Sequence, residues 1–382
     1  MRDVAVIGGG ASGLVAAISA AEAGDNVVVF EAADRVGKKI LATGNGRCNL
    51  TNMLLGAADY NHPAFVEPSL SQCSPAGVRA WFEERGLMTV EEREGRVYPL
   101  SNAANSVLDV LRLACERLGV ELRTEAKVKA VTGDDGGIEL VFEDGGISHP
   151  DKVIVACGGG SKLLKSCGHK LVSFQPVLCP IETDTRDLRG MSGVRVRARV
   201  KLEGAGAKGA LFEEDGELLF RDYGVSGIVA FNASRFLDEG QVLRVDFVPE
   251  IEEARLKEML ESRAGWARDC EELMCGIFHP QVNRMIMRVA GIKPSSKADE
   301  AGLARIACIS KRFKLAVKGP GSPKQAQVTR GGADVREFDP QTLESKFVPG
   351  LYACGECLDV DGPCGGYNLH WAWASGIVAG KA

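Results

Sequence analysis

The first thirty residues carry the most regular pattern of hydrophobic and polar positions in the chain. Residues 4–7 form a continuous apolar run, which is typical of a strand buried in a parallel sheet. Residues 13–23 are rich in alanine and end at Gly24, which predicts a helix stopped by glycine. Residues 26–30 form a second apolar run, so the segment as a whole predicts a strand–helix–strand unit of about 30 residues.

A similar succession of elements continues through the first half of the chain. Residues 75–85 and 103–118 have helical character, and residues 121–131 and 137–143 alternate like strands. A further apolar run at residues 153–156 predicts another buried strand. Strands that alternate with helices in this way predict an α/β fold.

The pattern changes after about residue 172. Residues 194–202 alternate between apolar and basic side chains, which predicts a half-exposed antiparallel strand. Its basic positions, Arg195, Arg197, Arg199 and Lys201, are interpreted as a solvated edge that discourages strand pairing. Further strands are predicted at residues 209–212, 217–220 and 241–248, and helices at residues 252–263, 269–276 and 281–289.

Three glycines separate the first predicted strand from the first predicted helix, in the spacing Gly8-x-Gly10-x-x-Gly13. Gly8 permits a tight turn, Gly10 lets the backbone approach a pyrophosphate, and Gly13 allows close helix–strand packing. Glu31, at the end of the second strand, is placed to accept a ribose hydroxyl. The motif predicts a dinucleotide site and leaves NAD and FAD open. A second match at residues 204–209 lies between two predicted strands and is interpreted as a hairpin turn.

A cluster of glycine and proline at residues 319–323 ends the part with the changed pattern. Residues 350–354 then predict a strand that leads into a glycine loop and a C-terminal helix. The simplest organisation is a discontinuous dinucleotide domain interrupted by a β-rich part and a small helical part. The predicted domains are residues 1–172 with 323–382, residues 173–250, and residues 251–322.

Composition narrows the classes of function. The 382 residues, 45% hydrophobic and 25% charged, are enough for two or three domains with a large core. The formal net charge of −5 disfavours nucleic acid and anionic membranes, and no apolar run reaches the ~18 residues of a membrane span. Twelve cysteines without a secretory signal predict reduced thiols in a cytoplasmic protein. We therefore expect a small-molecule substrate, with no nucleic-acid or membrane partner; the oligomeric state stays open.

Motifs beyond the first unit favour FAD over NAD. Residues 32–39 follow Glu31 with an Arg-x-Gly extension, and residues 350–362 place acidic residues after a strand. Residues 365–369 open the last helix, whose N–H groups would point at the flavin N1/O2 edge. This combination resembles FAD-binding flavoproteins with two dinucleotide-binding domains.

Five further segments extend the resemblance along nearly the whole chain: residues 43–52, 95–99, 216–227, 328–332 and 344–346. They resemble the bacterial FAD-binding flavoprotein family named after aminoacetone oxidase and after a bile-acid 3-dehydro reductase. That family implies an α/β fold in which a Rossmann-like FAD-binding domain carries an inserted β-barrel-like domain and a small helical domain. Arg221-Asp222 and Ile228 depart from the Thr-His pair and the proline that are common there, at positions of the insertion that should face the flavin.

The resemblance implies FAD contacts in the first glycine loop, after the second strand, on a strand near residue 128 that binds adenine through its backbone, and in the C-terminal loop. These contacts are Gly8, Gly10, Ala11, Ser12, Gly13, Glu31, Ala32, Lys38, Lys39, Gly44, Gly46, Arg47, Cys48, Val128, Gly158, Thr329, Gly355, Glu356, Asp361, Gly365, Gly366, Tyr367, Asn368 and Leu369.

Three residues are candidate catalytic groups. Tyr223, in the insertion, is a candidate proton donor to substrate; Cys48 follows the second glycine turn; and His370 would stabilise anionic reduced flavin or donate a proton. Packing is the alternative for Cys48, and a plain helix-face position is the alternative for His370. Cys354-x-x-Cys357 has the spacing of a redox dithiol but is interpreted as buried thiols, because Cys354 ends a buried strand. No Cys/His spacing predicts a metal site.

These expectations combine into an FAD-dependent oxidoreductase. The favoured reaction is NAD(P)H-linked reduction of a C=C or related bond in a small apolar substrate. Because the only other GxGxxG match is interpreted as a hairpin turn, no second motif predicts a nicotinamide domain, and NAD(P)H would visit the flavin transiently. An oxidase of a small amine that uses O₂ is the alternative. A flavin-dependent RNA-modification or interaction protein is a third hypothesis, which the acidic balance of the chain disfavours.

Overall fold

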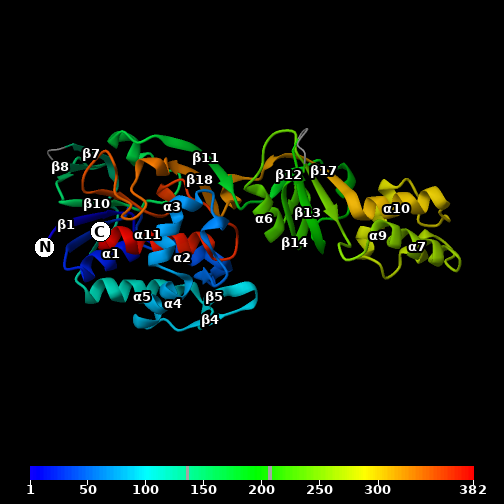
Figure 1. Ribbon diagram of the computed structural model, residues 1–382, viewed down its shortest axis with the longest axis horizontal. Helices are drawn as coiled ribbons and strands as arrows, with labels where there is room; N and C mark the ends of the chain where they lie inside the picture. The colour runs from blue at the N-terminus through cyan, green and yellow to red at the C-terminus, as the bar shows by residue number, and fades with distance from the viewer. Residues whose placement is uncertain (135–136, 205–208) are drawn as a thin grey trace. The chain divides into compact units, whose positions relative to one another are not determined.

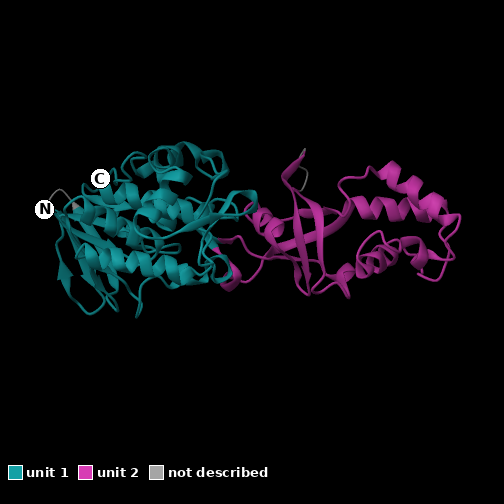
Figure 2. Ribbon diagram, turned by 90° about the horizontal axis from the view of Figure 1, so that it is seen from below, with its two compact units in different colours: residues 1–175, 328–382 teal, residues 176–327 magenta. Residues whose placement is uncertain are grey.

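The computed structural model describes residues 1–134, 137–204 and 209–382. The chain forms two compact units, which Figure 2 distinguishes by colour. Unit 1 comprises residues 1–175 and 328–382, and unit 2 comprises residues 176–327. The sequence predicted separate β-rich and helical domains with a boundary at residue 250, but the barrel and these helices belong to the same unit.

A five-stranded sheet forms the centre of unit 1. All its neighbouring strands are parallel, which explains why they read as continuous apolar runs: both faces of such a sheet are covered. The apolar runs at residues 4–7, 26–30 and 153–156 are confirmed as its three central strands. Across the sheet the strands are β19 (Leu351–Ala353), β10 (Lys152–Val155), β1 (Asp3–Ile7), β2 (Asn26–Phe30) and β6 (Glu121–Arg123).

Helices and a small antiparallel sheet lie on opposite sides of the parallel sheet (Figure 1). α1 packs against β1 and β2 and also against α5 and α11. On the other side, Phe142 of the small sheet meets Phe30 edge to face, with ring centroids 4.8 Å apart. The elements are α1 (Ala11–Glu22), α5 (Ala104–Arg117), α11 (Tyr367–Lys381), β7 (Val128–Asp134), β8 (Gly137–Phe142) and β9 (Ile147–Ser148).

The predicted helices at residues 75–85 and 103–118 are confirmed as α4 and α5. α2, α3 and a second three-stranded antiparallel sheet, β3-β5-β4, were not predicted. The remaining helices and strands of unit 1 are α2 (Lys38–Ala42), β3 (Thr51–Asn52), α3 (Pro63–Gln72), α4 (Pro75–Glu84), β4 (Thr89–Glu91) and β5 (Arg96–Pro99). β11 (Leu171–Val177) pairs with β18 (Val328–Ala333) where the chain leaves unit 1 and returns to it.

A closed six-stranded barrel forms one part of unit 2. Its interior is apolar, and the predicted strands at residues 209–212 and 217–220 are halves of one long strand. In barrel order the strands are β12 (Ile181–Thr183), β15 (Gly224–Ser226), β14 (Ala210–Arg221), β13 (Arg195–Glu203), β16 (Val242–Asp246) and β17 (Phe313–Pro320). The second glycine match at residues 204–209 falls largely on residues 205–208, outside the described residues.

The basic strand is β13, and the expectation that it forms an edge is wrong. It pairs with β14 on one side and β16 on the other, because the closed barrel has no edge there. Its solvated face is confirmed: Arg199 forms a bidentate ion pair with Asp215 (2.6 and 2.9 Å), and Lys201 pairs with Glu213 (3.0 Å). These basic residues of β13 thus form ion pairs with acidic residues on the neighbouring strand β14.

The helices at residues 252–263, 269–276 and 281–289 are confirmed, but α10 and the return strand β17 were not predicted. Leu243 of the barrel shares one buried cluster with Leu256 and Ile306 of the helices. The helices of unit 2 are α6 (Ile228–Ser234), α7 (Glu253–Ala264), α8 (Cys270–Met274), α9 (Pro280–Val289) and α10 (Glu300–Arg312). In the part of the chain that the structure describes, no helix combines the length and apolarity needed to cross a bilayer.

Candidate FAD site

The loop between β1 and α1 is shaped by its three motif glycines. Gly8 has φ +108°, and a Cβ on it would lie 2.6 Å from the carbonyl oxygen of Ala156. A Cβ on Gly13 would lie 1.9 Å from the carbonyl oxygen of Gly8, so the loop touches the first turn of α1. By contrast, no atom of the described residues lies within 4 Å of a Cβ placed on Gly10. The turn therefore leaves open space at the glycine that should face a pyrophosphate.

The N-termini of α1 and α11 lie at the site, and neither has a side-chain cap. The N-cap of α1 is Gly10 and that of α11 is Gly366, and neither helix has an acidic residue in its first turn. Their first N–H groups, including those of Ala11 and Ser12, therefore keep donor capacity and partial positive charge for an anion. Free N–H donors and positive potential of this kind suit a phosphate group and a flavin ring that gains negative charge on reduction.

Two glycines let α1 and α11 pack closely side by side. A Cβ on Gly376 would lie 2.5 Å from the carbonyl oxygen of Ser12, and a Cβ on Gly380 would lie 2.5 Å from that of Ala16. The two helices therefore run in the same direction. Because nine residues separate Tyr367 from Gly376, α11 begins about 14 Å beyond the first turn of α1. The two uncapped ends are spaced along the site, as an extended dinucleotide needs.

Glu31 directly follows β2, and its side chain is oriented by the glycine loop and by Ala33. Its Oε2 accepts a hydrogen bond from the N–H of Gly9 (2.7 Å), and its Oε1 accepts one from the N–H of Ala33 (2.8 Å). The carboxylate retains further acceptor capacity for ribose hydroxyls. Its main-chain carbonyl accepts from the N–H of Ala126 (2.9 Å), which holds the segment leading to the buried Val128 beside β2. Ala32, between them, is exposed.

A polar cluster joins four segments that are distant in the sequence. Lys39 Nζ lies 2.8 Å from Glu356 Oε2. The same carboxylate accepts from the N–H groups of Thr329 (3.3 Å) and Gly159 (3.4 Å), and a Cβ on Gly158 would lie 3.7 Å from it. Lys39 is 70% exposed, so its ammonium also remains accessible to a phosphate. Glu356 thus connects α2, β18 and the loops after β10 and β19.

The turn after α2 is built on left-handed backbone. Gly44 and Gly46 have φ +56° and +85°. Arg47 follows them and forms an ion pair with Glu92, so its guanidinium is directed at the β4–β5 hairpin. Lys38 likewise pairs at 2.5 Å with the aspartate four residues before it. Both basic groups have protein partners, and their role as cofactor contacts stays a prediction.

Asp361 is part of a buried ion pair. Its side chain is fully buried and accepts two hydrogen bonds from Arg330, from Nε at 2.7 Å and from Nη2 at 3.0 Å. Its main-chain N–H donates to Asn61 Oδ1 at 2.9 Å. Arg330 lies on β18, next to Thr329. The ion pair therefore fixes the C-terminal loop to the return strand of unit 1.

Gly355 is held between the two long helices. Its N–H donates to Ser375 Oγ at 2.9 Å, and its carbonyl accepts from Trp371 Nε1 at 3.1 Å. Its φ is +67°, and a Cβ on it would lie 2.6 Å from Ser12 Oγ. The loop after β19 thus lies directly against the first turn of α1.

The loop before α11 is closed by its own side chains. The Asn368 amide accepts from the N–H of Gly362 and donates to its carbonyl, both at 2.9 Å. Gly365 and Gly366 have φ +110° and +104°. Tyr367 and Leu369 are half-buried at the start of the helix. Asn368 therefore positions the loop through its side chain.

Cys48 does not fit the role of a catalytic thiol. It is fully buried, and burial raises the pKa of its thiol to about 11. The thiolate is the nucleophilic form of cysteine, and it is scarcely populated at such a pKa. The environment of Cys48 corrects this expectation in favour of the packing alternative.

His370 does not fit the role of a proton donor or flavin cation. It is fully buried, and its Nδ1 lies 2.8 Å from Thr51 Oγ1. Burial lowers the pKa of the imidazole to about 4, so the ring is neutral at pH 7. The side chain is part of the core beneath α11, which corrects the expectation that it faces the cofactor.

The depressed pKa of His370 predicts a loss of stability in mild acid. As pH falls below about 6.5, the unfolded chain gains a proton at this residue, whereas the folded chain gains it only near pH 4. The free energy of unfolding should therefore fall across that window, by up to about 3 kcal/mol from this residue. Denaturant titrations at pH 7, 5.5 and 4.5 measure it. In His370→Gln the loss should be smaller, and an equal loss would contradict this assignment.

Tyr223 lies in unit 2, in the tight turn between β14 and β15, and is half-buried. Its carbonyl accepts from the N–H of Thr183 at 3.1 Å, which fixes the turn to β12. Its role as a proton donor stays a prediction.

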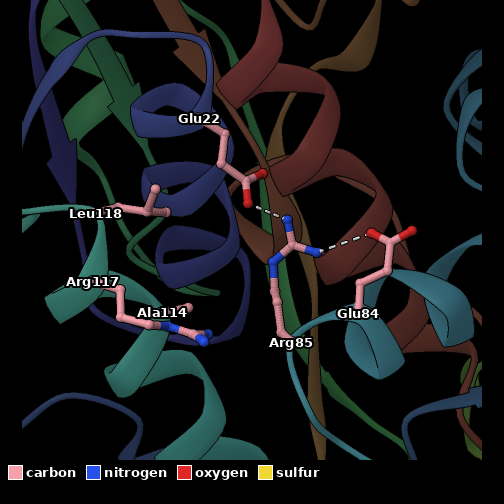
Figure 3. A pocket seen from close by; sticks show the side chains of 6 residues that line it. All are labelled: Glu22, Glu84, Arg85, Ala114, Arg117 and Leu118. Atoms are coloured by element: carbon pink, nitrogen blue, oxygen red, sulfur yellow. Dashed lines mark hydrogen bonds and ion pairs between the residues drawn. The ribbon is translucent and has the colours of Figure 1, made fainter.

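A pocket of about 260 Å³ lies elsewhere in unit 1, at the C-terminal ends of α1, α4 and α5. Figure 3 shows Arg85 between Glu22 and Glu84, with Arg117 and Leu118 across the opening. The glycine loop is at the opposite end of α1, so this pocket is separate from the candidate site.

The comparisons with known proteins identify the family. A family model described as "HI0933-like protein Rossmann domain" matches residues 2–382. The chain belongs to this family. It is similar to the 3-dehydro-bile acid delta(4,6)-reductase of Clostridium scindens, with 36% identity over 100% of this chain and 99% of that protein. It is 27% identical to the ribosomal RNA dihydrouridine synthase of Escherichia coli, over 98% of this chain and 96% of that protein. Among solved structures, a flavocytochrome c3 fumarate reductase matches with TM-score 0.49 and 16% identity, over 100% of this chain and 77% of that one.

Membership of the HI0933-like family confirms the predicted family and the α/β fold with its Rossmann-type FAD unit and inserted barrel. The protein is an FAD-dependent oxidoreductase. The uncapped ends of α1 and α11 and the open space at Gly10 fit this cofactor. The relatives named for ribosomal RNA leave the predicted absence of a nucleic-acid partner without confirmation.

Several residues of the site were missed from the sequence. Arg330 lies in a segment that carried the family resemblance, but nothing there indicates that it binds Asp361. Trp371 and Ser375, which hold Gly355, lie within one and two helical turns beyond the motif, respectively. Their spacing of four residues along α11 was the available signal.

Proposed function

We propose that the protein reduces a C=C bond conjugated to a carbonyl group, in a ring substrate, with NAD(P)H as electron donor. The observation that carries this proposal is the 36% identity, over essentially both full lengths, to a protein named as a 3-dehydro-bile acid delta(4,6)-reductase. In a steroid of that kind the ring double bonds are conjugated with the 3-oxo group. Conjugation makes the carbon of the double bond that lies farther from the carbonyl group electron-poor, so this carbon accepts a hydride.

The second group of relatives supports the same reaction class. Their name describes formation of dihydrouridine, in which the C5=C6 bond of uracil, conjugated with a ring carbonyl, has been reduced. A steroid enone and uracil have little else in common. The shared element is two-electron reduction of a conjugated ring double bond, and that is the reaction we assign to this chain.

A small ring molecule is the first candidate substrate. The identity to the steroid reductase, 36%, exceeds the 27% and 26% to the RNA-directed relatives. The formal net charge is −5, and the basic residues of β13 face acidic partners on β14. Tight RNA binding requires basic groups free to neutralise phosphates. A uridine in ribosomal RNA is the second candidate, because two full-length relatives carry that name.

Bound FAD supplies the hydride chemistry, and the protein contributes position and electrostatics. The loop at Gly10 and the N-terminus of α1 bind the phosphates. Glu31 accepts ribose hydroxyls, and the N-terminus of α11 supplies N–H donors and positive potential toward the ring. Tyr223 is the candidate that donates a proton to the second carbon of the double bond. NAD(P)H visits the flavin transiently.

Anaerobic reduction tests the electron donor. Stoichiometric NADPH or NADH should bleach the flavin absorbance of the purified protein, and small primary amines should leave it unchanged. Bleaching by amines and not by either nicotinamide would replace the reductase with an amine oxidase. For the second candidate, the reduced protein is incubated with ribosomal RNA that lacks dihydrouridine. A gain of two hydrogens on one uridine, measured by nucleoside mass spectrometry, would make RNA the substrate.

A further inference from the structure

Two cysteines from distant parts of the chain meet beside the FAD site. Cys157 lies two residues beyond the end of β10, and Cys357 ends a short turn after β19. Their Sγ atoms are 3.6 Å apart, although 200 residues separate them in the sequence. The sequence spacing had suggested Cys354 as the partner of Cys357. The structure instead brings Cys357 together with Cys157, because β10 and β19 are neighbours in the parallel sheet.

The pair lies among the loops that should hold the cofactor. A Cβ on Gly8 would lie 2.8 Å from the Cα of Cys157, so the first cysteine is in contact with the glycine loop. The Cys357 thiol faces the carbonyl of Gly158 at 3.7 Å. Cys357 directly follows Glu356, the carboxylate that joins Lys39 to the loops after β10 and β19. A covalent bond between the two sulfurs would therefore connect two walls of the site.

The two thiols are chemically unequal. Hydrogen bonding between the two thiols lowers the pKa of Cys157, and the same interaction, together with burial, raises the pKa of Cys357. Cys157 is also the more exposed of the two; Cys357 is 4% exposed. Cys157 is thus the thiol of the pair that reacts more readily with an oxidant. Cys357 is placed to resolve the product.

We propose that Cys157 and Cys357 form a reversible disulfide on reaction with hydrogen peroxide and that this bond locks the FAD site. The Cys157 thiolate attacks the peroxide, the O–O bond breaks, and a sulfenic acid forms. The hydroxide that leaves takes up the proton that the thiol had released and becomes one water. The Cys357 thiol then attacks that sulfur, the S–S bond forms, and a second water leaves. In total two thiols and one peroxide give one disulfide and two waters, with two electrons passing from sulfur to peroxide.

The test uses the FAD-loaded protein. It is treated with hydrogen peroxide near stoichiometry, alkylated, and mapped by mass spectrometry. We expect one cross-linked peptide pair containing Cys157 and Cys357, which dithiothreitol reverses. Cys157→Ser and Cys357→Ala should each abolish the cross-link. Cys354→Ala should retain it, because the thiol of Cys354 is fully buried in the same loop and its pKa is raised to about 12.

Release of FAD provides the second readout. With an excess of an FAD-specific apoenzyme such as apo-D-amino-acid oxidase as an acceptor, FAD should leave the oxidised protein about tenfold more slowly than the reduced protein, because the cross-link suppresses opening of the two loops. Cys157→Ser should release FAD at one rate under both conditions. Oxidation that falls first on the exposed Cys275, with no link between Cys157 and Cys357, would overturn the proposal. A disulfide that leaves FAD release unchanged would overturn its link to the cofactor.

Discussion

Gly13→Ala is expected to destabilise unit 1 and to abolish FAD binding. The new Cβ would lie 1.9 Å from the carbonyl oxygen of Gly8, and both groups are backbone, so neither moves without distorting the loop. Overpacking of this kind costs about 3 kcal/mol. Denaturant unfolding and the flavin-to-protein ratio of the purified protein measure the two effects. A variant with normal stability and full flavin content would contradict the described geometry of the loop.

Gly10→Ala is the matched control, because it adds the same methyl group three residues away. Gly10 has φ −86° and ψ −165°, which alanine adopts readily, and no atom of the described residues lies within 4 Å of its Cβ position. The free energy of unfolding of the apoprotein should change by no more than about 1 kcal/mol. Alanine is a poorer N-cap than glycine, so that change belongs to the start of α1, and it is still well below the cost of Gly13→Ala. FAD affinity should nevertheless fall at least about tenfold, because the methyl group occupies the space left for the pyrophosphate. Unchanged affinity would mean that the cofactor does not approach Gly10.

Arg330→Met is expected to have the second large effect. It removes the bidentate partner of Asp361, whose side chain is fully buried, and breaking a buried ion pair costs about 3–5 kcal/mol. The double variant Arg330→Met/Asp361→Leu should recover much of that loss, since no buried charge is left behind. Urea unfolding of the two variants and the unmodified protein gives the comparison.

Arg123→Met provides the control for this prediction. Arg123 also forms a two-point contact with a carboxylate, that of Glu121, but both side chains are about half exposed. Its loss should cost less than about 0.5 kcal/mol. Equal effects of Arg330→Met and Arg123→Met would show that burial of Asp361 does not determine the strength of its ion pair.

Local features of the fold were predictable because they depend on short-range pattern. The apolar runs of β1, β2 and β10 follow from burial on both sheet faces, and the glycine spacing follows from the turn it must make. The ion pair of Arg330 with Asp361 and the approach of Cys157 to Cys357 depend on which strands become neighbours. The sequence contains no local signal for that choice. β17 was missed for the same reason, since the helices of unit 2 separate it from the rest of the barrel.

The burial of His370 and Cys48 was not predictable for another reason. Both were expected at the cofactor because neighbouring residues in the sequence belong to the site. On a helix each successive side chain is turned by about 100°, so His370 faces the core although Leu369 is half-exposed. Cys48 has φ +58°, and its thiol is fully buried. Proximity along the chain therefore indicates which loop a residue belongs to, but not the direction of its side chain.

The most direct test of the central claim is the oxidation of the reduced protein by a conjugated ketone. The protein is reduced anaerobically with one equivalent of NADPH and mixed, without oxygen, with a 3-oxo-4-ene steroid or with its saturated 3-oxo analogue as control. We predict that the enone alone restores the flavin absorbance, with one equivalent of ring-saturated product by mass spectrometry. A flavin that stays reduced with the enone, and with uridine in ribosomal RNA, yet reoxidises in air would contradict the proposed reductase.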